Sequence, residues 1–279
     1  MRPVFLPSSM GELWTIMEEN PRASLFAGGT DLLVRLRRGT ADPPSLICLE
    51  RIPELQGVTL AGSTVTIGAC ATFAEMLKEP AAAAVPPVLA RAVREIGSPL
   101  IRAMGTIGGN ICNASPAGDS LPPLHVLDAE LDLVSARDRR CVKIGDFITG
   151  PGGTCLRPGE VLASVRFKLP EGPVIQHFEK VGARRALACS IVSMAALVRL
   201  SGNGVIEGAA LAWGGTGPVI IRCGAAESIL AGKRLTEETL SAAAGTAREA
   251  VMPIDDLRGG AAYRRKVAGN LLMRLLEYA

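Results

Sequence analysis

The chain has 279 residues and a formal net charge of +3, with acidic and basic side chains interspersed along it. This length suffices for two ordinary domains, and the even charge pattern gives no basic face of the kind that binds nucleic acid or a membrane surface. The start lacks the apolar core of a signal peptide, and the longest apolar stretch, residues 187–198, is too short to span a bilayer. We therefore expect a cytoplasmic protein without membrane insertion.

The first 57 residues predict a compact β/α unit. A capping box, Ser9-Met10-Gly11-Glu12, begins a helix that Asn20-Pro21 ends. A glycine pair follows the first strand, and Gly39 closes the second helix. The predicted elements are a helix over 10–17, a strand over 24–27, a helix over 32–38 and a strand over 45–49.

Residues 58–170 predict a second mixed unit that begins with a β-hairpin. Thr72 and Glu75 form another capping box, and Gly97 can end the helix over 87–96. Strands are expected over 130–135, 140–144 and 165–169. Two prolines and a glycine in Pro170-Glu171-Gly172-Pro173 cannot continue a strand, so we place a domain boundary there.

Residues 171–279 predict a separate C-terminal domain. Three strands come first, and Ser201-Gly202-Asn203-Gly204 forms the turn between the last two. Helices then follow to the end of the chain. The predicted elements are strands over 174–181, 190–200 and 205–213 and helices over 225–231, 236–251 and 262–278.

The chain contains few residues in recognisable catalytic or metal-binding motifs. Its seven cysteines stand far apart without a C-x-x-C pair, so we expect no metal ligands and no iron–sulfur cluster in this chain. Neither of the two histidines, His125 and His177, lies in a motif that makes it the base of a nucleophile. The G-x-G-x-x-G fingerprint and the P-loop are also missing. We predict no conventional catalytic residue.

Two glycine pairs are the most informative motifs. They lie in Ala27-Gly28-Gly29-Thr30-Asp31 and in Thr106-Ile107-Gly108-Gly109-Asn110. A glycine pair at the end of a strand lets backbone N–H groups turn inward and form a concave site for phosphate oxygens. Either pair alone is also compatible with an ordinary turn. Together, in a chain without catalytic side chains, they suggest a diphosphate-bearing cofactor that brings its own chemistry.

Longer runs around these motifs resemble a known family. AGGTDLLVRLRRG from Ala27, TIGGNICNASPAGDSLPPL from Thr106, FEKVGARRALACSIVSMAA from Phe178 and YRRKVAGNLL from Tyr263 are similar to the FAD-binding medium subunit of molybdenum hydroxylases, the group of xanthine and carbon monoxide dehydrogenases. The resemblance implies an α+β fold: a vanillyl-alcohol-oxidase (PCMH)-type FAD-binding domain over 1–170, with subdomains of about 1–57 and 58–170. A C-terminal domain with a three-stranded antiparallel sheet and helices follows over 171–279.

The resemblance also implies a set of FAD-binding residues. In it, the backbones of Ala27, Gly28, Gly29, Thr30 and Asp31 and of Thr106, Ile107, Gly108, Gly109 and Asn110 hold the diphosphate. Asp119 accepts a hydrogen bond from the cofactor, the main chain of Leu162 lies against its flavin or adenine part, and Ile96 packs near the rings. Lys180, next to Glu179, lies near the isoalloxazine or its partner acceptor; an exposed strand lysine paired with Glu179 is the alternative.

The implied role is electron transfer within a complex. A molybdopterin-binding large subunit hydroxylates the substrate, [2Fe–2S] clusters of a small subunit carry the electrons, and FAD on this chain passes them to NAD, ferredoxin or a quinone. The assembly is expected to be a dimer of heterotrimers. Some relatives carry an aromatic residue, eight positions after this lysine, that shields the flavin; here that position is Ala188.

Two other functions remain compatible with the sequence. One is a stand-alone FAD-dependent oxidoreductase of the same fold that acts on its own small substrate, which needs a substrate pocket with a proton donor. The other is a scaffold that keeps the fold without flavin. Flavin absorption bands distinguish the scaffold from both flavoproteins.

Overall fold

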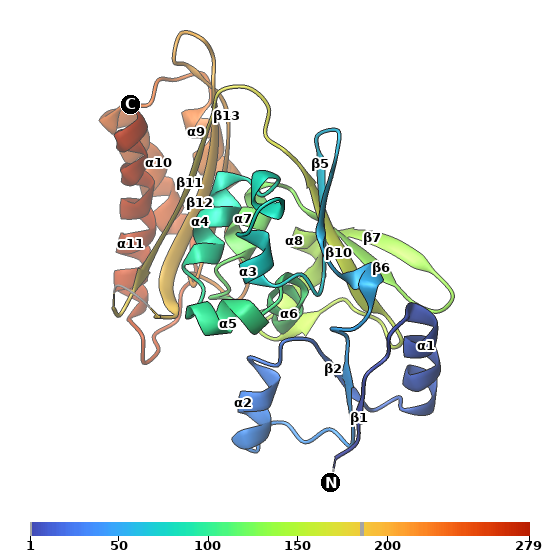
Figure 1. The fold of residues 1–279 in the computed structure, drawn as a ribbon. Coiled ribbons are helices and arrows are strands. Elements are labelled where there is room, and N and C mark those ends of the chain that lie inside the picture. The colour runs from blue at the N-terminus through green and yellow to red at the C-terminus, as the bar shows by residue number, and fades with distance from the viewer. Residues whose placement is uncertain (1, 185–186) are drawn as a thin grey trace.

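A computed structural model describes residues 2–184 and 187–279 (Figure 1). Within them, three sheets follow one another along the chain, each with its own helices. A small antiparallel pair, β8 (Ile148–Gly150) and β9 (Gly153–Thr154), adds to the second unit. The predicted α+β fold class is confirmed. Among the described residues, no helix is both long and apolar enough to cross a membrane.

The N-terminal unit is a parallel three-stranded sheet in the order β1-β3-β2. Helix α1 buries Leu13 in a small core with Ile47 and Ile52. Its capping box is only half formed: Ser9 accepts from the backbone of Glu12, but the Glu12 carboxylate accepts from Ser8. The elements are β1 (Val4–Phe5), α1 (Met10–Glu19), β2 (Ser24–Phe26), α2 (Leu32–Arg37), β3 (Leu46–Cys48) and η1 (Pro53–Leu55).

The second unit is a five-stranded antiparallel sheet in the order β4-β5-β10-β6-β7. Its helices α3, α4, α6 and α7 lie between this sheet and the C-terminal sheet (Figure 1). The elements, besides β8 and β9, are β4 (Val58–Ala61), β5 (Thr64–Gly68), α3 (Phe73–Met76), η2 (Ala81–Ala83), α4 (Pro87–Arg94), α5 (Pro99–Met104), α6 (Ile107–Asn113), α7 (Leu121–Val126), β6 (Glu130–Val134), β7 (Arg139–Lys143), α8 (Ile144–Phe147) and β10 (Val161–Lys168).

The second glycine pair does not form the strand-end turn that the sequence predicts. Thr106 is a helix N-cap whose side chain accepts from the Gly109 backbone, so the pair lies in the first turn of α6. Gly108 allows close packing, since a Cβ there would lie 2.6 Å from the backbone oxygen of Ala69. Helices α5 and α7 were also not predicted; α5 begins with Pro99, and α7 has Pro122 and Pro123 in its first turn, where proline is tolerated.

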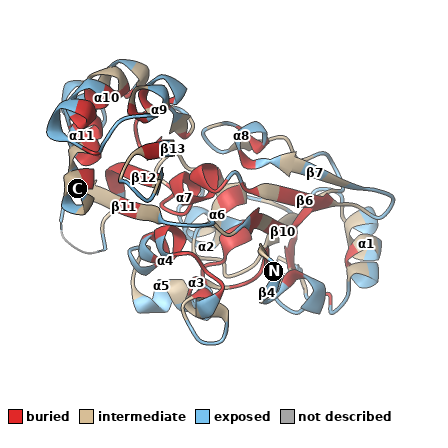
Figure 2. Ribbon diagram, turned by 90° about the horizontal axis from the view of Figure 1, so that it is seen from above, coloured by how far each residue is buried: buried red, intermediate tan, exposed pale blue. Residues whose placement is uncertain are grey.

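The C-terminal unit is an antiparallel sheet in the order β11-β12-β13-β14, so one short strand joins the three predicted ones. Both faces of this sheet are covered: one packs on α4 and α7, the other on α9, α10 and α11. Figure 2 shows β12 and α7 as mostly buried. The elements are β11 (Val174–Gly182), β12 (Ser190–Leu200), β13 (Ile206–Gly214), β14 (Ile221–Arg222), α9 (Gly224–Leu230), α10 (Glu237–Ala250), α11 (Ala261–Met273) and η3 (Arg274–Tyr278).

The alternation along β12 shows how this sheet joins two cores. Ala195 packs in the core that contains α4 and α7, whereas its neighbours Met194 and Ala196 pack against the C-terminal helices. Successive strand side chains point to opposite faces, so a strand covered on both sides is apolar throughout. The apolar run after residue 190 therefore reflects a doubly buried strand.

Candidate functional site

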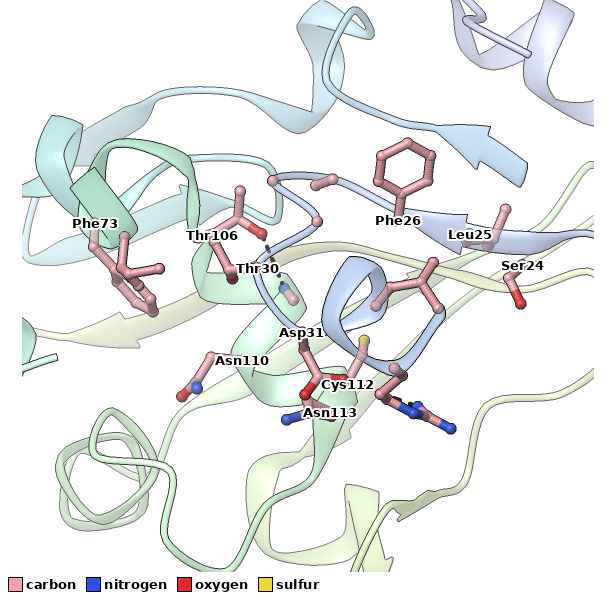
Figure 3. Close-up of a pocket in the computed structure, with 18 of the residues that line it drawn as sticks. Ser24, Leu25, Phe26, Thr30, Asp31, Phe73, Thr106, Asn110, Cys112 and Asn113 are labelled. Atoms are coloured by element: carbon pink, nitrogen blue, oxygen red, sulfur yellow. Dashed lines mark hydrogen bonds and ion pairs between the residues drawn. The ribbon is translucent and has the colours of Figure 1, made fainter. Parts of the chain in front are cut away.

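A cleft of about 710 Å³ opens between the loop after β2 and the helix α6. In Figure 3, Thr30 and Asp31 come from the loop and Thr106, Asn110, Cys112 and Asn113 from α6 or its N-cap. The structure thus brings the two glycine motifs together from opposite sides of one cavity. The predicted site residues that line it are Ala27, Gly28, Gly29, Thr30, Asp31, Ile96, Thr106, Gly109 and Asn110.

The first glycine motif offers free hydrogen-bond donors. Within the described part of the chain, the backbone N–H groups of residues 28–31 donate to no protein acceptor. Gly29 has a φ of +67°, which favours glycine. Gly28 lies against the C-terminus of α5, where a Cβ would come 1.5 Å from the Met104 carbonyl oxygen. Successive unpartnered amides beside a cleft are suited to an anionic ligand.

The second motif differs from the first in its backbone amides. The N–H groups of Ile107 and Gly108 donate to Ala71 and Ala69, and those of Gly109 and Asn110 donate to the Thr106 hydroxyl and carbonyl oxygens. Ile107 and Gly108 are buried and do not line the cleft. These four amides thus already have protein acceptors, two in residues 69–71 and two at the helix N-cap, and the predicted contact of this backbone with a diphosphate stays a prediction. The Thr106 hydroxyl hydrogen and the Asn110 side-chain NH₂ remain as donors.

The walls of the cleft combine apolar and ionic groups that the sequence reasoning did not include. Phe26, Phe73 and Ile101 provide apolar surface. Cys112 adds to it, because burial raises the pKa of its thiol to about 12 and keeps it neutral. Arg35 also lines the cleft, and its guanidinium lies 3.9 Å from the Asp31 carboxylate. Asn113 also lines the cleft. It lies one helical turn after Asn110, so its place beside Asn110 could be predicted once residues 107–113 are assigned to a helix.

Asp119 and Lys180 pair with each other outside the lining of the cleft. The Lys180 ammonium lies 2.7 Å from Asp119 Oδ2 and also donates to the Glu95 and Ala188 carbonyl oxygens. Ser190 donates its hydroxyl to the other oxygen of Asp119. Burial raises the pKa of the Asp119 carboxyl, and the Lys180 charge opposes that shift. Lys180 is thus a buried ion-pair partner, not an exposed strand lysine paired with Glu179.

Leu162 also lies away from the cleft. It is buried on β10, where it pairs with Leu133 of β6. Ala188 precedes β12, and its carbonyl oxygen accepts from Lys180. Residues 185–186, which belong to the run quoted from Phe178, lie outside the described residues.

The cleft fits a nucleotide cofactor. Its volume of about 710 Å³ lies within the range of small-molecule sites. Free amides and Arg35 suit a diphosphate, and the aromatic and aliphatic wall suits a ring system. No group of three or more histidine, cysteine, aspartate or glutamate side chains suited to a metal ion occurs among the described residues.

Comparisons with known proteins cover nearly the whole chain. Residues 1–170 match the FAD binding domain in molybdopterin dehydrogenase, and residues 177–279 match the CO dehydrogenase flavoprotein C-terminal domain. The carbon monoxide dehydrogenase medium chain of Hydrogenophaga pseudoflava is 34% identical over 98% of this chain and 95% of its own. The xanthine dehydrogenase FAD-binding subunit of Escherichia coli O157:H7 is 31% identical over 98% and 94%.

Solved structures agree with these relatives. A chain of carbon monoxide dehydrogenase from Hydrogenophaga pseudoflava superposes with a TM-score of 0.94 at 32% identity, covering 99% of this chain and 96% of that one. A chain of quinoline 2-oxidoreductase from Pseudomonas putida 86 reaches 0.94 at 26% identity, covering 100% and 96%. The chain belongs to the family of FAD-binding flavoprotein subunits of molybdenum hydroxylases such as xanthine and carbon monoxide dehydrogenases.

Proposed function

We propose that this chain binds FAD in the cleft and transfers electrons within a molybdenum-containing hydroxylase complex. The observation that carries the proposal is the row of unpartnered backbone amides at residues 28–31 beside the cleft, in a chain that belongs to this family. Amide donors fixed in place bind a diphosphate without having to reorganise.

Each wall of the cleft has a part in this binding. The amides of 28–31 donate to the diphosphate, and the Arg35 guanidinium adds positive charge. Phe26, Phe73 and Ile96 contact the apolar rings and exclude water from them. When bound, FAD supplies the redox chemistry, so the chain needs no general acid or base.

Asp119, Leu162 and Lys180 remain proposed cofactor contacts. Lys180 donates to the carbonyl oxygen of Glu95, and the next residue, Ile96, lines the cleft. The Lys180 ammonium is therefore bound next to the part of the cleft wall that Ile96 forms. Its positive charge would stabilise negative charge on a reduced flavin, an effect that the Asp119 carboxylate, 2.7 Å from the ammonium, reduces.

The same proposal assigns the rest of the reaction to partner chains. Electrons arrive from [2Fe–2S] clusters of a small subunit, after a molybdopterin-binding large subunit has oxidised the substrate, and leave to an external acceptor such as NAD. Several relatives are named medium chains, which supports a multi-subunit assembly. We place the complex in the cytoplasm as a dimer of heterotrimers.

Purification of the chain alone and with its partners tests this division of labour. The isolated chain is expected to be yellow, with flavin absorption bands, and to undergo reduction of its FAD by dithionite or NADH. It is not expected to oxidise purines or aldehydes until the other subunits are added. A colourless chain that cannot be loaded with FAD contradicts the binding proposal, and robust substrate oxidation by the isolated chain supports a stand-alone oxidoreductase instead.

A further inference from the structure

The side-chain amide of Asn110 is hydrogen-bonded to the loop that precedes α7, residues 114–120. Ser120 Oγ donates a hydrogen bond to Asn110 Oδ1 at 2.7 Å, and Ser120 is completely buried. A Cβ on Gly118 would lie 3.3 Å from the same Oδ1 atom, so the loop also packs against it. The oxygen side of the amide is therefore turned toward the loop.

The other side of this amide is the donor side. Nδ2 lies opposite Oδ1 in the planar amide and carries two hydrogens. Asn110 lines the cleft, and within the described ranges its Nδ2 donates to no protein group. Asp31, from the loop with the free amides, lines the same cleft, and both residues are labelled in Figure 3. A ligand that binds the loop amides thus lies in the cleft that Asn110 lines.

We propose that Ser120 is a positioning residue that fixes the Asn110 amide with its NH₂ group toward the diphosphate of the cofactor. The proposal rests on the proposed FAD function of the cleft. A 180° rotation of the amide about its Cβ–Cγ bond exchanges Oδ1 and Nδ2. An unrestrained amide can therefore present its oxygen to the ligand, and that oxygen repels a phosphate oxygen. The hydrogen bond from Ser120 to Oδ1 holds the amide in the orientation in which its oxygen faces the loop and its NH₂ group is left for the ligand.

The C-terminal sheet keeps Ser120 in place. The preceding residue, Asp119, binds Lys180 and Ser190 of β11 and β12, and the Pro116 carbonyl oxygen accepts from the Gly215 backbone. Of these two neighbouring side chains, Asp119 thus binds the C-terminal sheet and Ser120 binds Asn110 of α6. The donor at Asn110 is positioned through the contact between the two parts of the chain.

Binding of FAD and of ADP to the full chain, freed of its flavin, tests the proposal. Ser120→Ala is expected to raise both dissociation constants about 2- to 10-fold, the effect of one hydrogen bond. In the Asn110→Ala background the same change is expected to have no further effect, because Ser120 acts through Asn110. Riboflavin, which lacks a diphosphate, is expected to bind the variant and the unchanged chain equally.

Two further variants keep the test decisive. Ser115→Ala is the matched control in the same loop, since within residues 2–184 and 187–279 its hydroxyl is bound by the Ala117 backbone N–H and by no other group. Asn110→Asp keeps an acceptor for Ser120 but removes the NH₂ group, so it is expected to weaken ADP binding at least as much as Asn110→Ala. The positioning role is overturned if Ser120→Ala binds FAD and ADP as tightly as the unchanged chain. It is also overturned if Ser120→Ala weakens binding as much in the Asn110→Ala background as in the unchanged chain, or if Asn110→Asp keeps full affinity. Failure of the unchanged chain to bind FAD or ADP overturns the cleft's proposed function instead.

Discussion

The Lys180 ammonium and the Asp119 carboxylate lie 2.7 Å apart, and the side chains of both are 8% exposed. Asp119 precedes α7 in the second unit, and Lys180 lies on β11 of the C-terminal sheet. Ser190 and two carbonyl oxygens satisfy the remaining polar atoms of the pair. Such a pair is held in place by its hydrogen bonds as much as by its charges.

Removal of one member of this pair is expected to destabilise the chain strongly. Asp119→Ala leaves an uncompensated ammonium in the interior, at a cost of about 3–5 kcal/mol of unfolding free energy. Urea denaturation followed by circular dichroism measures this loss. The double variant Asp119→Leu/Lys180→Met is expected to recover most of it, because no buried charge remains. An Asp119→Ala chain as stable as the unchanged one contradicts the importance of the pair.

Gly28→Ala is expected to abolish FAD retention. Its new Cβ would lie 1.5 Å from the Met104 carbonyl oxygen, so the 27–31 loop must move away from α5 and its amides leave their positions. Among the four paired glycines only Gly29 has a positive φ, so at Gly28 the close approach of α5 and not the backbone conformation requires glycine. The flavin-to-protein absorbance ratio of the purified chain measures retention. Gly11→Ala on α1, whose Cβ meets nothing nearer than 4.0 Å, is the control.

The two histidines make stability depend on pH near neutrality. Burial is the main cause that lowers the pKa of both His125 and His177 below 6.5. The unfolded chain therefore binds protons first as the pH falls, so the unfolding free energy is highest above pH 6.5 and declines below it. Urea titrations between pH 8 and 5.5 measure this slope. His125→Gln/His177→Gln is expected to flatten it, whatever its absolute stability; an unchanged slope assigns the dependence to other groups.

A different pair controls stability in acid. Arg140 Nε lies 2.7 Å from Glu160 Oε1 and is the main cause that lowers the pKa of Glu160 from 4.5 to about 2. A lowered carboxyl pKa contributes stability that is complete above pH 4.5 and is lost as the pH falls toward 2. The difference in Tm between the unchanged chain and Glu160→Gln is therefore expected to shrink over that interval. A difference that stays constant would exclude ionisation as its cause.

Much of the local structure follows from the sequence because its signals are local. Thr72 and Glu75 form the predicted capping box, and the 201–204 turn joins β12 and β13. The apolar run in β12 predicts a buried strand. Helix α6 was missed because two glycines have low helix propensity, whereas the Thr106 cap and close packing on Ala69 stabilise the helix in the folded chain.

The sequence by itself determined the capping box at Thr72, the turn at 201–204, the glycine motif at 27–31 and, through four runs of residues, the family. These properties depend on neighbours within a few positions. Only the tertiary structure decided that Asn110 and Arg35 line the same cleft as the first motif and that Asp119 pairs with Lys180. Ser120 reaches Asn110 from ten residues away, and Lys180 meets Asp119 across 61. Such contacts arise from the packing of sheets and helices, which no local pattern specifies.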